Sequence, residues 1–114
     1  MRLEPTPAQQ EICERVSVEP DPPWADAKLG LGPMVGVPVN GLRHAPEPGT
    51  SGWFIWAGGE IDQSDDAYFG SVHVAHLERV YPQVVPYLAL PPGWRFQVAP
   101  GHEDVWYDAT LLAV

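Results

Sequence analysis

The densest group of side chains that could do chemistry is a run of acids in the middle of the chain. Residues 60–66 read EIDQSDD and carry the carboxylates of Glu60, Asp62, Asp65 and Asp66. A calcium loop supplies six to eight oxygen ligands, and its common form has a central glycine and a final bidentate glutamate. This run has neither. Acid–base catalysis would need one carboxyl buried so that its pKa rises, and the spacing indicates no burial. The run favours a solvent-exposed turn or a loop that contacts another protein.

The histidines offer a second possible site. His73 and His76 are three residues apart and would share one face of a helix, as a pair of metal ligands can. If His73 instead ends a strand, the two side chains diverge, and in either case a third ligand must come from elsewhere. A metal-dependent hydrolase that uses this pair and the acidic loop is one open interpretation. The simpler one is surface or structural histidines, and we predict no metal and no cofactor.

Candidate nucleophiles lack the neighbours that would activate them. Cys13 is the single cysteine, so the chain forms no disulfide with itself, and it falls on or near the apolar face of a predicted helix, as a small buried residue does. No serine stands in a Gly-x-Ser-x-Gly frame. The pair Gly58-Gly59 lacks the lysine of a phosphate-binding loop. We therefore predict a protein that is not an enzyme.

The charge of the chain limits its partners. Among 114 residues there are 15 acids and 6 bases, which gives a net charge of −9. Such a surface repels nucleic acid and anionic membranes and suits a protein with a basic surface. No apolar run approaches the roughly 20 residues that cross a bilayer, and the first ten residues lack the apolar core of a signal peptide. We expect a soluble, cytoplasmic protein.

The first predicted element is a helix. Thr6 can cap it, Pro7 suits its first position, and Gln9 completes a capping box. A spacing of four residues then predicts one apolar stripe, made of Ala8, Ile12 and Val16. The prolines of residues 20–27 end the helix.

Strands are predicted to follow. Residues 34–39 favour a short strand, and residues 53–57 a central one, because alternation gives it two apolar faces. A strand over 68–73 leads into a short helix over 74–81, and Pro86 limits the next helical piece to a turn or a kinked segment. The last two strands, around 94–98 and 105–111, should form an antiparallel hairpin.

These elements predict an α+β fold. We expect an antiparallel or mixed sheet of four to five strands, with an N-terminal helix and short helices packed on it. Residues 1–114 are predicted to form one domain, in which 1–28 are the helix and a proline-rich connection and 29–114 are the sheet-containing body. Most tryptophans fall on predicted strands and belong to the core. Tyr68 and Trp106 lie beside polar residues, so they are candidates for contact with a partner.

The second half of the chain resembles a known family. The stretches SGWFIWAGGE, AYFGSVHVAHLERVYPQVVPYL and LPPGWRF occur in the order found in a small bacterial family, once catalogued as a domain of unknown function and later assigned to polymorphic-toxin immunity proteins, group thirty-three. The resemblance covers roughly residues 50–96. It departs from the family pattern at Thr50, where the family usually has aspartate, and at Ala57-Gly58-Gly59-Glu60, where it commonly has Ser-Gly-Asp-Glu.

The resemblance implies a non-catalytic protein that binds and neutralises a cognate toxin. With the net acidity, it predicts a toxin partner that has a basic surface. The predicted contacts on this chain are Glu60, Asp62, Asp65, Asp66, Tyr68 and Trp106. The alternative is a stand-alone domain that binds a small ligand among its tryptophans or has a regulatory role.

Overall fold

The computed structural model describes residues 4–58 and 70–112. These residues form two α-helices, two short 3-10 helices and six strands, in the chain order α1 (Pro7–Arg15), β1 (Lys28–Leu31), β2 (Val39–Arg43), β3 (Thr50–Ala57), β4 (Gly70–His73), α2 (Val74–Val80), η2 (Pro82–Tyr87), β5 (Trp94–Ala99), β6 (His102–Tyr107) and η3 (Ala109–Leu112).

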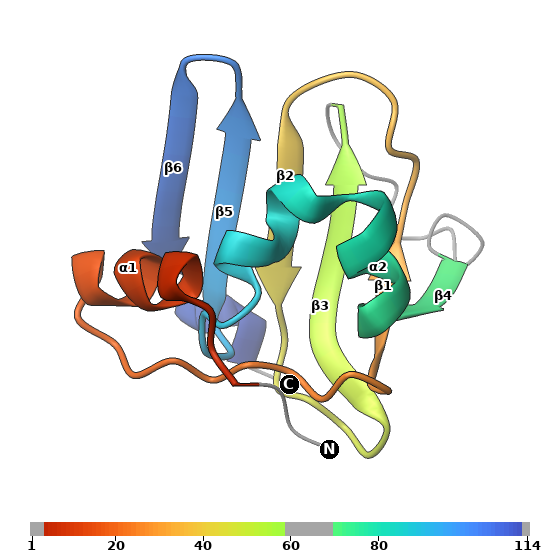
Figure 1. Cartoon of the computed structure of the whole chain (residues 1–114), viewed down its shortest axis with the longest axis horizontal. Helices are drawn as coiled ribbons and strands as arrows, with labels where there is room; N and C mark the ends of the chain where they lie inside the picture. Colours follow the sequence, from red (N-terminus) through yellow and green to blue (C-terminus); the bar gives the residue numbers. More distant parts are fainter. Residues whose placement is uncertain (1–3, 59–69, 113–114) are drawn as a thin grey trace.

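The strands form one mixed sheet in the order β4-β1-β3-β2-β5-β6. β1 and β3 are parallel, and the other neighbours are antiparallel. Helices α1, α2 and η2 lie on one face of this sheet, in front of it in Figure 1. The predicted α+β class, with its N-terminal helix, is confirmed, but the sheet has six strands rather than four to five.

One predicted strand was wrong. Residues 34–39 are irregular apart from Val39, and the strands of this region lie on either side, as β1 and β2. Pro33 and Pro38 have no N–H to donate to a neighbouring strand. Gly36 between them has a φ of 91°, which is far from extended backbone. This segment therefore connects two strands of the sheet.

Helix α1 begins as the sequence indicates. The Thr6 side chain accepts from the Gln9 N–H at 3.1 Å, and the Gln9 side chain accepts from the Thr6 N–H at 2.9 Å, so the capping box is confirmed. The buried face is Gln9, Ile12 and Cys13, whereas Ala8 is exposed, so the predicted stripe was wrong at its first position. Gln9 takes the buried position because its side-chain amide also donates to the Val85 carbonyl at 2.9 Å. This hydrogen bond attaches α1 to η2.

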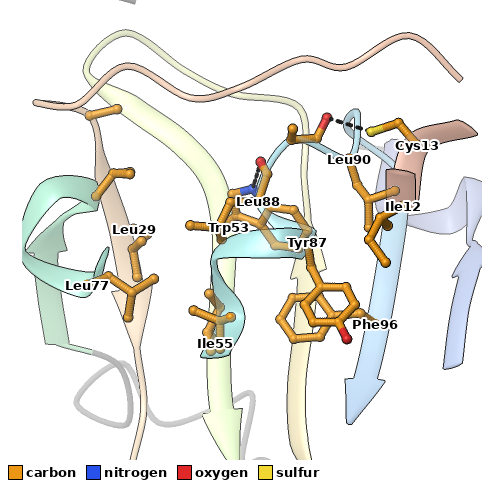
Figure 2. Packing of buried hydrophobic residues seen from close by; sticks show 14 residues of the cluster. Ile12, Cys13, Leu29, Trp53, Ile55, Leu77, Tyr87, Leu88, Leu90 and Phe96 are labelled. Atoms are coloured by element: carbon orange, nitrogen blue, oxygen red, sulfur yellow. Dashed lines mark hydrogen bonds between the residues drawn. The ribbon is translucent and has the colours of Figure 1, made fainter. Parts of the chain in front are cut away.

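Strand β3 is central, as predicted, between β1 and β2. Trp53 and Ile55 are fully buried under the helices, and the Trp53 indole donates to the Leu88 carbonyl at 3.0 Å (Figure 2). On the helix-free face Trp56 is 5% exposed and Phe54 is partly buried. The Phe54 ring extends over β1, where a Cβ on Gly30 would lie 2.5 Å from it.

The core under the helices includes an aromatic stack. The rings of Tyr87 and Phe96 are 4.7 Å apart and nearly parallel, and Trp53 lies 5.6 Å from Phe96 (Figure 2). Gly41 of β2 faces Phe96, and a Cβ there would lie 2.1 Å from the ring. The short 3-10 helix η2, which contains Pro86 as expected, thus packs its tyrosine on strand β5.

A buried arginine joins three segments. Arg43, at the end of β2, is 3% exposed. Its guanidinium donates to the carbonyls of Ser51 at 2.8 Å, Asp21 at 2.7 Å and Leu90 at 2.7 Å. It also lies 5.7 Å from the Trp53 ring centroid, where the ring attracts a cation. The proline-rich connection and the segment after η2 are therefore both attached to the sheet through one side chain.

The last two strands form the predicted antiparallel hairpin, joined by Pro100-Gly101. The second strand is shorter than expected, because it ends at Tyr107 and η3 follows. Asp108 ends it: its carboxylate accepts from the Thr110 N–H at 3.0 Å, which turns the chain into η3.

Candidate partner-binding surface

Of the six residues predicted to contact a partner, the structure describes one. Glu60, Asp62, Asp65, Asp66 and Tyr68 lie outside the described residues, so their role stays a prediction. Trp106 is described, and it lies on β6 at the edge of the sheet, partly buried.

Trp106 belongs to a row of side chains across the helix-free face. The strand register places Trp106 opposite Arg95, Arg95 opposite Leu42, and Leu42 opposite Phe54. The Arg95 guanidinium lies 5.3 Å from the Trp106 ring centroid and is 3.2 Å from the Asp108 carboxylate. The arginine therefore links the Trp106 ring to Asp108, and the partly buried ring lies on the edge strand of the sheet.

A second row on the same face is polar. The Gln97 side-chain amide donates to the Asn40 side-chain oxygen at 3.0 Å, and the Gln97 side-chain oxygen is 3.1 Å from the His102 ring nitrogen. Asn40 in turn donates to the Gly58 carbonyl at 3.0 Å. The amides bond to one another and to backbone, which is the arrangement of a structural network.

On the helix-covered face, Glu103 of β6 joins three elements. Its two carboxylate oxygens accept from the Tyr87 hydroxyl of η2 and from Arg15 of α1. These hydrogen bonds, that of Tyr87 first, hold the pKa of Glu103 below its usual value. The pKa of Tyr87 is raised, by burial first and then by Glu103. Glu103 is therefore ionised and Tyr87 neutral near pH 7, which suits a structural link and not a general acid.

A groove of about 220 Å³ lies beside this link, between α1 and β6. Its lining is Ile12, Arg15 and Val16 from α1 and Glu103 and Val105 from β6. Drug-sized ligands occupy pockets of about 300–1,000 Å³. This groove is smaller and contains no tryptophan, so it does not match the tryptophan-lined ligand pocket of the alternative interpretation.

The histidine pair is divided between two elements. His73 ends β4 and is the N-cap residue of α2, whereas His76 lies inside α2, and both are exposed. Within residues 4–58 and 70–112, no three His, Cys, Asp or Glu side chains are grouped so that they could hold a metal ion.

Cys13 is buried, as expected. Its thiol lies 3.6 Å from the Ala89 carbonyl oxygen (Figure 2), and burial raises its pKa, so the thiolate is disfavoured. None of the described helices is long and apolar enough to span a membrane.

Two groups of functional interest were missed from the sequence. Glu103, Tyr87 and Arg15 come from three distant parts of the chain, and no local pattern joins them. The sequence did contain a signal for the buried position of Arg43. Side chains alternate along β2, so Arg43 shares a face with Val39 and Gly41, and this face is the one covered by the helices.

The described residues form a small α+β protein with helices on one face of a mixed six-stranded sheet. A family model, the Imm33-like domain, matches residues 8–108, and the chain belongs to this family. The match confirms the resemblance to immunity proteins noted over residues 50–96, and it extends into the N-terminal third, where the motifs indicated no relation. Membership implies a toxin partner. No curated protein and no solved structure was found to match the chain.

Proposed function

We propose that this protein is an immunity protein that binds a cognate toxin and neutralises it through an acidic surface, without catalysing a reaction. The observation that carries the proposal is the match of residues 8–108 to the Imm33-like domain. The net charge of −9 supports a partner with a basic surface, since complementary potentials speed encounter.

The placement of three of the five described bases supports an acidic surface, whereas Lys28 and Arg79 are exposed. Arg43 is buried, Arg15 is paired with Glu103, and Arg95 with Asp108. Burial and these ion pairs reduce the positive potential that the three guanidinium groups add to the surface. Carboxylates can then occupy a basic cleft where a toxin would hold phosphate groups. We include the loop of residues 60–68 in this surface because four of its residues are acids.

Co-expression tests this proposal. The toxin gene should lie beside this one, and producing its toxic domain should stop growth of a bacterial host unless this protein is produced too. We expect rescue and a stable one-to-one complex of the purified proteins. A matched control is the same protein with Trp53→Ala, which removes a fully buried side chain and should abolish rescue through unfolding. Failure of the folded protein to rescue growth or to bind that toxin would refute the proposed function.

A further inference from the structure

β6 forms one edge of the described sheet, and it is a regular edge. It pairs with β5 through six consecutive residue pairs without a bulge, and it contains no proline. Proteins usually protect such an edge, because its outer N–H and C=O groups can pair with another chain. The opposite edge, β4, has only four residues.

The register shows which backbone groups of β6 point outward. The two-residue turn Pro100-Gly101 makes Ala99 and His102 a hydrogen-bonded pair, and bonded pairs then alternate along an antiparallel ladder. The same alternation continues past the strand, where the Asp108 N–H donates to the Gly93 carbonyl at 2.7 Å. The backbone groups that point away from β5 are therefore those of Glu103, Val105 and Tyr107, and no described residue bonds to them.

Helix α1 provides a wall beside this edge. It crosses β6 on the helix-covered face and continues beyond it (Figure 1). The groove between them has an apolar floor formed by Ile12, Val16 and Val105. A strand added next to β6 would direct every second side chain into this groove. The side chains between them would lie beside Asp104 and Trp106 on the helix-free face.

The charges near the edge select the kind of strand. Glu11 and Glu14 of α1 and Glu103 and Asp104 of β6 are exposed, and Arg15 is the base among them. Arg95, next to Trp106 on the helix-free face, is paired with Asp108. The C-terminal end of α1, which carries partial negative charge, lies here too. Two copies of this chain that paired through β6 would bring these carboxylates together, so the edge disfavours self-association and favours a basic segment.

We propose that the outer edge of β6 receives an extended, Lys- or Arg-bearing segment of the toxin as an additional strand. This inference rests on the proposed function and names its contact face. The main chain of the segment bonds to Glu103, Val105 and Tyr107. Its apolar side chains enter the groove under α1, and its basic side chains lie beside Asp104. Strand addition of this kind combines main-chain affinity with side-chain specificity.

Amide hydrogen exchange measured by NMR tests the geometry. The probe is an inactive variant of the toxic domain encoded beside this gene, added to saturation. The amides of Glu103, Val105 and Tyr107 should exchange at least about tenfold more slowly in the complex, because each gains a bond. Those of Asp104 and Trp106 already bond to β5, so they should change much less. This alternation is specific to strand addition, since a side-chain contact would shield neighbouring amides alike.

Two variants test the same surface. Asp104→Lys should weaken binding about tenfold at low salt, and less at high salt. Glu47→Lys is the matched control, an exposed acid in the connection between β2 and β3, and it should leave affinity unchanged. Val105→Pro removes one outward N–H that β5 does not use, so it should abolish binding in a protein that keeps its fold.

The outcomes separate this inference from the proposed function. If the toxin binds while the outward amides still exchange freely, the β6 edge is not the contact, and the proposed function still stands. A toxin that does not bind overturns both. Protection of the same amides in the protein alone, increasing with its concentration, identifies a second copy as the occupant and overturns a toxin strand.

Discussion

Arg43 allows a direct test of what attaches the proline-rich connection to the sheet. Replacement by methionine keeps much of the apolar stem and removes the guanidinium, so the carbonyls of Ser51, Asp21 and Leu90 lose a charged donor. Hydrogen bonds to charged groups contribute about 1.5–3 kcal/mol each. Part of this loss is offset, because burying methionine avoids the desolvation cost of burying the charged guanidinium. We expect Arg43→Met to lower the free energy of unfolding by about 3–5 kcal/mol.

Urea unfolding followed by tryptophan fluorescence measures this change. For a chain of this length, 3–5 kcal/mol also corresponds to roughly 12–20 °C in the melting temperature. Arg79→Met is the matched control, an exposed arginine on α2, and should change stability by less than about 0.5 kcal/mol. If Arg43→Met lost less than about 1 kcal/mol, the guanidinium would not be what holds these segments, and the reasoning from its three bonds would be refuted.

Three other changes have expected outcomes. Glu103→Gln should lower stability at pH 7, because the pKa of Glu103 is lower in the folded state than in the unfolded state. The stability that the ionised carboxylate contributes is complete above the unfolded pKa of about 4.3 and is lost as the pH falls through the folded pKa. The stabilities of wild type and variant should therefore converge in acid-unfolding curves. A methyl group added at Gly41 would face the fully buried Phe96, whereas one added at Gly30 would face the partly exposed Phe54. Gly41→Ala should therefore lower the free energy of unfolding in urea by about 2–3 kcal/mol, and Gly30→Ala should lower it less. Equal losses would contradict this. Replacing Asp62, Asp65 and Asp66 by lysine should slow association with the toxin, more at low salt than at high. The control replaces the exposed acids Glu19, Asp26 and Glu47 by lysine. If the loop variant associates at the wild-type rate in stopped flow, the loop is excluded as a contact.

Local patterns predicted the elements whose signals are local. The capping box starts α1 at the expected residue, because Thr6 and Gln9 satisfy each other's backbone within one turn. Residues 53–57 predicted a central strand because both of its faces are apolar. A strand with only one apolar face would have left its other face to solvent. Prolines limited η2 to a short helix. The strand predicted over 34–39 failed for a related reason: apolar composition suggested pairing, but two prolines and a glycine with positive φ remove the backbone geometry that pairing needs.

The sequence by itself determined that this is an acidic α+β protein with one N-terminal helix, a central apolar strand and a final hairpin, and it was sufficient to place the chain among immunity proteins. Only the tertiary structure decided which residues meet. Arg15 and Tyr87 converge on the Glu103 carboxylate, Arg43 reaches three separate segments, and β6 becomes an edge with α1 beside it. These contacts join residues that are far apart along the chain. Short-range spacing cannot specify them, because they depend on strand order and on which face of the sheet each helix covers.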